Sequence, residues 1–426
     1  MPSPSRTSKI LRYTLIGVIM LSLAGLLSWY FFLRNQGDAL RALDEGRGAG
    51  ITPPSFTGLI GSTYGNIVDS IASLAGGGTE TPTRPPRLWQ ITKTPVAGAG
   101  FVPQNAGMMN ASSSPSALYD LRFVERGTGY MFEANPENGS FARLTNTLVP
   151  RVYEASVGVN GVLILRGLDE DTSFILTNAA QAISTSASGE ATALTLSALP
   201  QDIRELVLSP SGEEVLYLIE QLPGFSIVRA EWNGERARRV GSVGVAGWHM
   251  EWLSDDRIVL TQNGDDNAPG RVYEFKNGTL SPLTPRASAR TLLPRANSSA
   301  LLYGSASGNS TLTARVDENA STISLPIRTT IDKCVWAPGD NLTVYCAVPK
   351  ILPDARSQGA TFRGESHGTD AWWKIDVSAG SVEPLYDPGG VGGIDVENPT
   401  IDANGDYIAF MNARDKSLWL LRISEN

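Results

Sequence analysis

Cysteine and histidine are scarce in this chain, and their scarcity excludes several kinds of site. The 426 residues include two cysteines and two histidines. A structural zinc site uses about four Cys or His ligands, and neither His249 nor His367 lies in the segment that holds the cysteines. A redox CxxC pair is also missing. We therefore predict no metal site and no cofactor.

Clusters of positive charge are missing as well. The formal net charge is −8 and the isoelectric point is near 5.1. No run of Lys or Arg interleaves with aromatic residues, which is the pattern typical of nucleic-acid binding. A nucleic-acid partner is therefore not expected.

The two cysteines flank one turn. Residues 337–341, with the sequence APGDN, favour a tight reversal, and CVW before it and TVYC after it favour strands. A hairpin centred on Asp340 places Cys334 opposite Cys346, at a separation that nearly suits a disulfide. We predict this disulfide, and two buried thiols on neighbouring strands are the alternative. Disulfides persist only in oxidising compartments, so the location of the chain decides between them.

An apolar segment near the N-terminus predicts that location. An uncharged apolar run begins at Tyr13 and ends at Leu33, which is long enough for a helix to span a membrane. Three basic residues precede the run, and only Arg34 follows closely. The positive-inside rule then predicts a cytoplasmic tail (1–12), a single-pass signal anchor (13–33) and an extracytoplasmic remainder. Cleavage near Ala24 is the alternative.

Residues 34–86 are rich in Gly, Ser, Thr and Pro, which predicts a tether. Within it, apolar residues recur at alternating steps of four and three between Ile60 and Leu74. This spacing predicts a short helix over 55–75. Such a helix would dock on its own domain or would meet a partner helix.

The remainder, 87–426, predicts an all-β fold with an internal repeat. Turn signals flanked by strand-forming residues recur at positions 161, 212, 255, 297, 339 and 405. A period just above 40 with four strands per unit is typical of a β-propeller blade. A long final interval predicts an inserted loop at 351–369. Residues 87–92 look like a missing fourth strand for the last blade, so we predict seven blades closed by an N-terminal strand.

The turns SPSG (209–212) and APGD (337–340) resemble those of WD40-like repeats in TolB-type periplasmic propellers. The segments RFVERGTGYMFE (122–133) and PRVYEASV (150–157) resemble those of uncharacterised membrane-anchored bacterial propellers. The resemblance covers about 87–423 and implies protein binding rather than catalysis. Several turns lack the proline, and a membrane anchor is not a TolB feature.

One catalytic pattern occurs literally, because GESHG (364–368) matches G-x-S-x-G. A nucleophile elbow needs a preceding strand, a following helix and a later histidine, and no histidine follows His367. We interpret the segment as a surface loop and predict that the protein is not an enzyme.

Two groups of residues are candidates for binding. Acids in the expected innermost strands could line the channel and bind a cation or a cationic peptide, or could simply face water: Glu154, Glu205, Glu251 and Glu397. Loops on one face of a propeller are the usual place for binding residues. The candidates on that face are Asp169, Asp171, Asp265, Asp266, Arg356, Arg363 and Trp372. For Trp372, packing against the next blade is the alternative.

The sequence thus favours an extracytoplasmic, membrane-anchored interaction scaffold or envelope-complex subunit. Its expected partner is an envelope or surface protein. A cell-surface receptor for a glycan or peptide is a second hypothesis. A propeller hydrolase or lyase that uses channel carboxylates is a third.

Overall fold

The computed structural model describes residues 84–104, 118–182, 191–254, 257–262, 271–283, 292–296, 298–304, 311–317, 322–351, 367–389 and 393–425. The predicted tail, anchor and helix 55–75, and the tether up to residue 83, lie outside these residues. Among the residues that are described, no helix is both long and apolar enough to cross a membrane. The chain divides into two compact units, Met1–Glu80 and Thr81–Asn426, and the second is described below.

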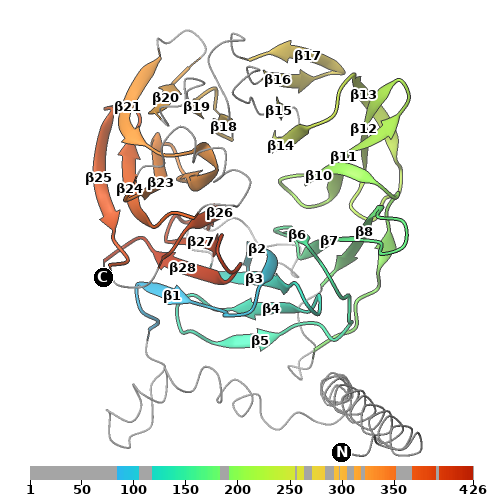
Figure 1. The fold of residues 1–426 in the computed structure, drawn as a ribbon, viewed down its shortest axis with the longest axis horizontal. Coiled ribbons are helices and arrows are strands. Elements are labelled where there is room, and N and C mark those ends of the chain that lie inside the picture. The colour runs from blue at the N-terminus through green and yellow to red at the C-terminus, as the bar shows by residue number, and fades with distance from the viewer. Residues whose placement is uncertain are drawn as a thin grey trace, which may run out of the picture. The chain divides into compact units, whose positions relative to one another are not determined.

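The second unit is a β-propeller. Seven antiparallel sheets of four strands each form a ring (Figure 1), as the sequence predicts. The first strands of blades 1 to 7 lie nearest the centre: β2 (Val96–Pro103), β6 (Glu154–Val157), β10 (Ile203–Leu208), β14 (Trp248–Ser254), β18 (Leu292–Pro294), β22 (Cys334–Trp336) and β26 (Val396–Ile401). The second strands are β3 (Tyr119–Glu125), β7 (Val162–Leu168), β11 (Glu214–Gln221), β15 (Arg257–Gln262), β19 (Leu301–Gly304), β23 (Thr343–Pro349) and β27 (Tyr407–Asn412).

The outer half of each blade completes the sheet. The third strands are β4 (Met131–Ala134), β8 (Ile175–Gln181), β12 (Gly224–Glu231), β16 (Arg271–Lys276), β20 (Thr311–Arg315), β24 (Asp370–Asp376) and β28 (Leu418–Arg422). The fourth strands are β5 (Phe141–Arg143), β9 (Ser197–Ala198), β13 (Arg238–Val243), β17 (Thr279–Pro282), β21 (Ile323–Arg328), β25 (Ser381–Tyr386) and, for blade 7, β1 (Leu88–Gln90). A short 3-10 helix, η2 (Ile331–Lys333), precedes blade 6.

The burial of each strand follows its apolar pattern. Second strands lie inside a blade with a neighbouring blade on either face, and they carry unbroken apolar runs. In β7 the five residues from Val162 are buried, and every residue of β27 is buried. Outer strands alternate instead, as in β21, where Leu325 and Ile327 are buried between exposed neighbours. The apolar pattern of a segment therefore indicates both that it forms a strand and whether that strand lies inside the blade or at its outer edge.

Seven apolar clusters hold the ring together, one between each pair of neighbouring blades. Blade 7 packs on both sides, against blade 6 and against blade 1. The N-terminal strand closes the ring as predicted, because Leu88 pairs with Leu421 and Gln90 with Trp419. Closure removes the exposed edge that an open sheet would present.

Blades 1 and 2 approach each other unusually closely through glycine. The segment VAGAG opens β2, and a Cβ added at Gly98 would lie 2.0 Å from the backbone oxygen of Ala155 in β6. A Cβ added at Gly100 would lie 2.9 Å from the oxygen of Val157. Since real Cβ atoms do not approach this closely, both positions need glycine for the two inner strands to meet.

Arginine side chains add polar links between blades. Arg166 of blade 2 donates from Nη2 to the carbonyl of Ile203 in blade 3, over 2.8 Å. Arg257 of blade 4 donates to the carbonyl of Arg295, at 3.1 Å, and Arg295 in turn donates to Asn341 of blade 6, at 3.0 Å. Because guanidinium offers several donors in one plane, a single side chain satisfies more than one group.

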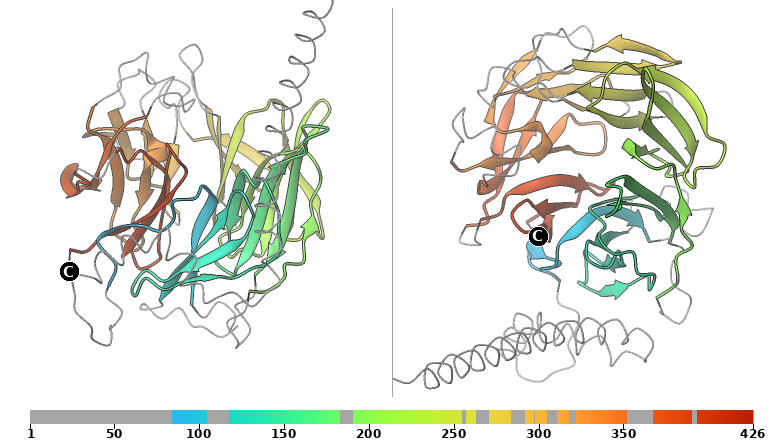
Figure 2. Two further views of the ribbon diagram at one scale, coloured as in Figure 1. Left: turned by 60° about the horizontal axis from the view of Figure 1, so that its bottom comes forward. Right: turned by 45° about the vertical axis from the view of Figure 1, so that its right-hand side comes forward.

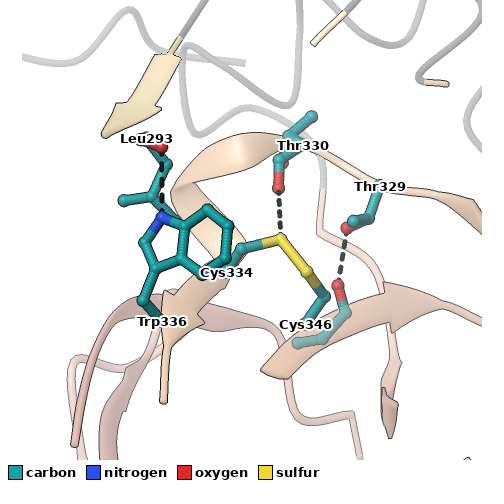
Figure 3. Close-up of a disulfide and its surroundings, with 7 residues drawn as sticks. Leu293, Thr329, Thr330, Cys334, Trp336 and Cys346 are labelled. Carbon is teal, nitrogen blue, oxygen red and sulfur yellow. Dashed lines mark hydrogen bonds between the residues drawn. A yellow bond between two sulfur atoms is a disulfide. The ribbon is translucent and has the colours of Figure 1, made fainter. Parts of the chain in front are cut away.

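The predicted hairpin of blade 6 holds the predicted disulfide. Cys334 pairs with Cys346 across β22 and β23, their Cα atoms are 4.1 Å apart, and their sulfurs are bonded (Figure 3). Next to it, Trp336 Nε1 donates to the carbonyl of Leu293 in blade 5, at 3.2 Å. The disulfide therefore lies in the apolar cluster between blades 5 and 6.

Candidate functional site

The antiparallel order of the strands sorts the connections onto two faces. Second-to-third connections and the connections between blades emerge on one face, which we call the loop face. First-to-second and third-to-fourth turns emerge on the other, the hairpin face. Figure 2 shows the ring from two further directions. The predicted insertion at 351–369 falls between β23 and β24, and its residues 352–366 lie outside the described residues.

Large apolar side chains are exposed mainly on the loop face. In or beside its connections lie Leu148, Tyr153, Leu168, Phe174, Leu222, Val245 and Ile351. Among the described residues, the exceptions are Leu118 and Val159 on the hairpin side and Leu196, which directly precedes β9. Single exposed apolar residues are ordinary, but their gathering on one face is typical of interaction surfaces. Sequence reasoning missed this group because most of these residues directly precede, end or follow a strand, where an apolar residue looks like part of the core.

Five of these residues occupy the loop face of blades 2 and 3, and we call them the apolar patch: Tyr153, Leu168, Phe174, Leu222 and Val245. The two blades meet there, because the Asp202 amide donates to the carbonyl of Ile175 at 2.8 Å. Phe174 directly precedes Ile175, so its blade 2 loop adjoins the first residues of blade 3. The side chain of Leu222 is the most exposed of the patch, at 89 %.

Two predicted loop acids lie beside the patch. Asp169 Oδ1 accepts hydrogen bonds from the amide of Asp171 and from the amide and hydroxyl of Thr172. The hydroxyl bond and the amide bond hold the pKa of Asp169 below its usual value. Asp169 is thus ionised and folds its own loop, and Asp171 is exposed next to it.

Other predicted face residues do not join this group. Trp372 is only 1 % exposed and packs 5.4 Å, centroid to centroid, from Phe410 of blade 7. It is therefore not a binding-face residue, and the alternative of packing against the next blade is correct. Asp265, Asp266, Arg356 and Arg363 lie outside the described residues.

The four predicted channel acids all lie on innermost strands. Glu154 opens β6 and pairs with Arg166 at 2.6 Å. Glu397, in β26, pairs with Lys416 of the β27–β28 turn. These two carboxylates are therefore neutralised by partners of their own blades. Their role as ligands for a cation stays a prediction.

The other two channel acids face a histidine rather than a strong base. Glu205 Oε1 lies 3.6 Å from His249 Nδ1 and 3.4 Å from the amide of Met250, across the junction of blades 3 and 4. The hydrogen bond to Glu205 raises the pKa of His249, against the effect of burial. Loss of solvation raises the pKa of Glu251 to about 7, and His249 opposes the shift. Glu251 thus titrates near neutrality, as acid–base groups often do.

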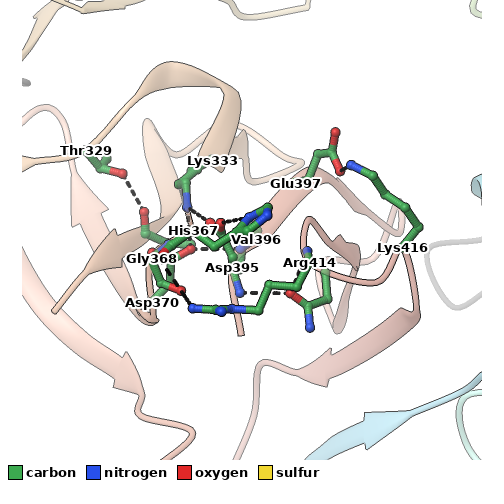
Figure 4. A network of polar contacts seen from close by, with 12 residues as sticks. Thr329, Lys333, His367, Gly368, Asp370, Asp395, Val396, Glu397, Arg414 and Lys416 are labelled. Atoms are coloured by element: carbon green, nitrogen blue, oxygen red, sulfur yellow. Dashed lines mark hydrogen bonds and ion pairs between the residues drawn. The ribbon is translucent and has the colours of Figure 1, made fainter. Parts of the chain in front are cut away.

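A second polar cluster, which sequence reasoning missed, lies at the junction of blades 6 and 7 (Figure 4). Lys333 Nζ donates to Asp370 at 2.6 Å and also to Asp395. The three side chains are buried. The second Asp395 oxygen lies 3.0 Å from His367 Nδ1 and accepts from the amide of Gly368, at 3.2 Å. We call these residues the lysine network.

Opposing effects set the charges of the lysine network. Burial alone would lower the pKa of Lys333, but the two carboxylates raise it above its usual value. The pKa of Asp395 is held low because Lys333, His367 and the Gly368 amide outweigh burial, whereas burial raises the pKa of Asp370. One oxygen of Asp370 bonds the amide of Val396, at 2.8 Å, while the other is buried with no hydrogen-bond partner. The arrangement ties three connections of the loop face together.

A pocket of about 350 Å³ adjoins the inner strands β2, β6 and β26. Its polar lining comes from Glu154, Ser156, Asn398 and Thr400, and its floor is formed largely by small and apolar residues. Within the described part of the chain, no group of three or more His, Cys, Asp or Glu residues is placed to hold a metal ion.

No family model and no curated protein matches this chain. Among solved structures, TolB from Acinetobacter baumannii is 12 % identical, with a TM-score of 0.40 over 73 % of this chain and 78 % of its own. The Pan2 WD40 domain of Neurospora crassa is 12 % identical, with a TM-score of 0.47 over 78 % and 92 %. An oligogalacturonate lyase in complex with manganese is 10 % identical, with a TM-score of 0.45 over 72 % and 86 %. Identities this low concern the fold only.

Proposed function

We propose that this protein is an extracytoplasmic, membrane-anchored β-propeller that acts as a non-catalytic scaffold for another protein of the envelope or cell surface. The gathering of exposed apolar side chains on the loop face of blades 2 and 3 carries the proposal. A closed ring of seven packed blades holds these side chains on a rigid frame, as interaction surfaces require. The anchoring rests on the apolar run at 13–33.

Site-specific photo-crosslinking in the native envelope tests the scaffold. A photoreactive residue replaces Phe174 or Leu222 on the loop face, or Val159 on the hairpin face as the control. Phe174 and Val159 are matched, at 45 % and 44 % exposed. We expect a discrete protein adduct from positions 174 and 222 and none from 159. Equal adducts from all three positions, or none from the loop face, would contradict the proposal.

An enzyme that uses channel carboxylates is the second candidate, and the pKa of Glu251 favours it. A carboxyl group that titrates near 7 can both accept and donate a proton at neutral pH. The test is turnover of a panel of oligosaccharides by the wild type and by Glu251→Gln. A turnover that Glu251→Gln abolishes would establish the enzyme. Turnover that both variants share equally, or that neither shows, would exclude a role for Glu251.

A further inference from the structure

We propose that the apolar patch binds a basic segment of the partner protein, in which apolar side chains are interspersed with Lys or Arg. This inference rests on the scaffold function proposed above and specifies the chemistry of the partner. Three observations support it: the apolar surface, the charge around it, and the composition and direction of the chain's own N-terminal segment.

The patch supplies apolar contacts on two blades. Leu168 and Phe174, at 51 % and 45 % exposed, flank the β7–β8 loop of blade 2. Leu222 lies in the β11–β12 turn of blade 3. Gly224 opens β12 directly after that turn, and a Cβ at this position would meet the backbone of Val243 and Gly244, so the turn lies close to Val245. Together these side chains offer several separate contacts for an apolar partner.

The rim of the patch is acidic. Arg151 pairs with Glu170, and Arg204 lies 2.8 Å from Asp202 and 3.4 Å from Glu220. These two guanidinium groups are therefore already matched by carboxylates. Asp169 and Asp171 add negative charge on the same loop. Arg126 also lies at the rim, where it donates to the carbonyl of Tyr153 at 3.0 Å. The described residues around the patch thus include five acids and three arginines, and such a rim attracts Lys and Arg.

On the channel side of the patch, Glu205 adds a carboxylate, and Glu251, whose pKa is about 7, adds a partly ionised one. Glu205 and Glu251 lie on the inner strands of the adjoining blades 3 and 4, and His249 is their neighbour. Among the described residues, neither acid forms a salt bridge with Lys or Arg. A basic side chain that reaches inward from the patch would meet these acids. The field therefore favours a cationic segment over an anionic one.

The N-terminal segment of this chain does not fit the same surface. The tether, 34–86, holds four arginines against five acidic residues, so it carries no net positive charge. The chain also enters the ring at the hairpin face, because Pro85 lies beside Gly139 of the β4–β5 turn, and Arg422 donates to its carbonyl at 3.2 Å. The apolar patch lies on the loop face, opposite the face at which the chain enters the ring. A separate protein is therefore the better candidate to bind the patch.

The test measures the binding of three short fluorescent peptides to the full chain in nonionic detergent. In the peptides Leu alternates with Lys, Leu with Glu, or Ser with Lys. We expect the Leu–Lys peptide to bind and the other two to bind at least tenfold more weakly. The double variant Phe174→Ser/Leu222→Ser should weaken Leu–Lys binding by about tenfold. Asp169→Asn/Asp171→Asn should weaken it several-fold, as should high salt.

The matched control is Leu118→Ser/Val159→Ser, which removes apolar side chains of 47 % and 44 % exposure from the hairpin side. It should leave Leu–Lys binding unchanged. Equal loss in this control, equal binding of the Leu–Glu peptide, or failure of the Leu–Lys peptide to bind would overturn the inference. So would self-association or vesicle binding of the wild type that Phe174→Ser/Leu222→Ser abolishes, since the occupant would then be a second copy or lipid.

The crosslinking experiment separates the two proposals. An adduct at Phe174 whose crosslinked partner segment lacks Lys and Arg would overturn the basic segment and leave the scaffold intact. An adduct whose segment combines apolar and basic residues would support both. No adduct from the loop face would overturn the scaffold itself.

Discussion

The loop face carries two regions with opposite polarity. At blades 6 and 7, the charged lysine network is buried, and nearly all of its polar atoms have partners. At blades 2 and 3, apolar side chains are exposed and the nearby acids reach solvent. Buried charges that satisfy one another fix the structure, whereas exposed apolar groups have an unmet preference for a partner. The comparison favours a stabilising role for the first region and is consistent with the binding role that we propose for the second.

Removal of Lys333 should lower the free energy of unfolding more than any other substitution proposed here. Lys333→Met leaves the carboxylates of Asp370 and Asp395 buried without their cation, which should cost about 3–5 kcal/mol of unfolding free energy. Denaturant unfolding measures the loss. Lys374→Met is the control, because Lys374 is exposed and lies 3.8 Å from Glu383, and its removal should cost less than about 1 kcal/mol. Equal effects of the two variants would show that the lysine network is not structural.

The pH dependence of the unfolding free energy should reveal the raised pKa of Glu251. Its folded pKa of about 7 exceeds the unfolded value of 4.5, so the folded state binds the proton more tightly. The associated stability is therefore present below pH 4.5 and is lost as pH rises to about 7. Relative to Glu251→Gln, the wild type should lose on the order of 2–3 kcal/mol across this window. A constant difference between the two proteins would contradict the raised pKa.

Loss of the Cys334–Cys346 disulfide in blade 6 should lower the free energy of unfolding somewhat less than Lys333→Met does. The sequence separation of 12 between Cys334 and Cys346 predicts a loss of about 2–3 kcal/mol in Cys334→Ala/Cys346→Ala, chiefly because the unfolded chain gains freedom. Thermal unfolding with and without a reductant measures it. The double variant should not respond to the reductant, and a wild type that is equally insensitive would argue against the bond.

Substitutions in the apolar patch should change stability least. Phe174→Ser/Leu222→Ser removes side chains that are already in water, so unfolding free energy should stay within about 0.5 kcal/mol per site. The same thermal scans measure it. A loss comparable to that of Lys333→Met would mean that the patch is packed rather than free, and the comparison of the two regions would fail.

Local sequence signals predicted the frame because the frame is made of local units. Turn residues such as Gly212 and Gly339 adopt positive φ, and the repeat of these turns defines the blades. Strand-forming residues at 87–92 predicted closure because only blade 7 lacked a fourth strand. The channel acids were placed on inner strands for the same reason, since position within a repeat fixes position within the ring.

The lysine network and the apolar patch depend on tertiary contacts, so no local sequence signal predicted either of them. Lys333, Asp370 and Asp395 belong to three connections that come together only in the closed ring. Phe174 stands next to an apolar strand, so its sequence environment resembles that of a core residue. Trp372 is the reverse case. Its place beside an inserted loop made it a candidate for the binding face, but the structure shows that it is buried.

Ring closure by β1 also decides how this protein carries mechanical load. Any pull on the N-terminal segment reaches the ring at Arg87 and the three-residue strand that follows it. Arg87 donates to the carbonyls of Leu385 in blade 6, at 3.0 Å, and of Ile423, at 3.1 Å, and its guanidinium lies over the ring of Tyr386. One side chain therefore spreads the force across two blades.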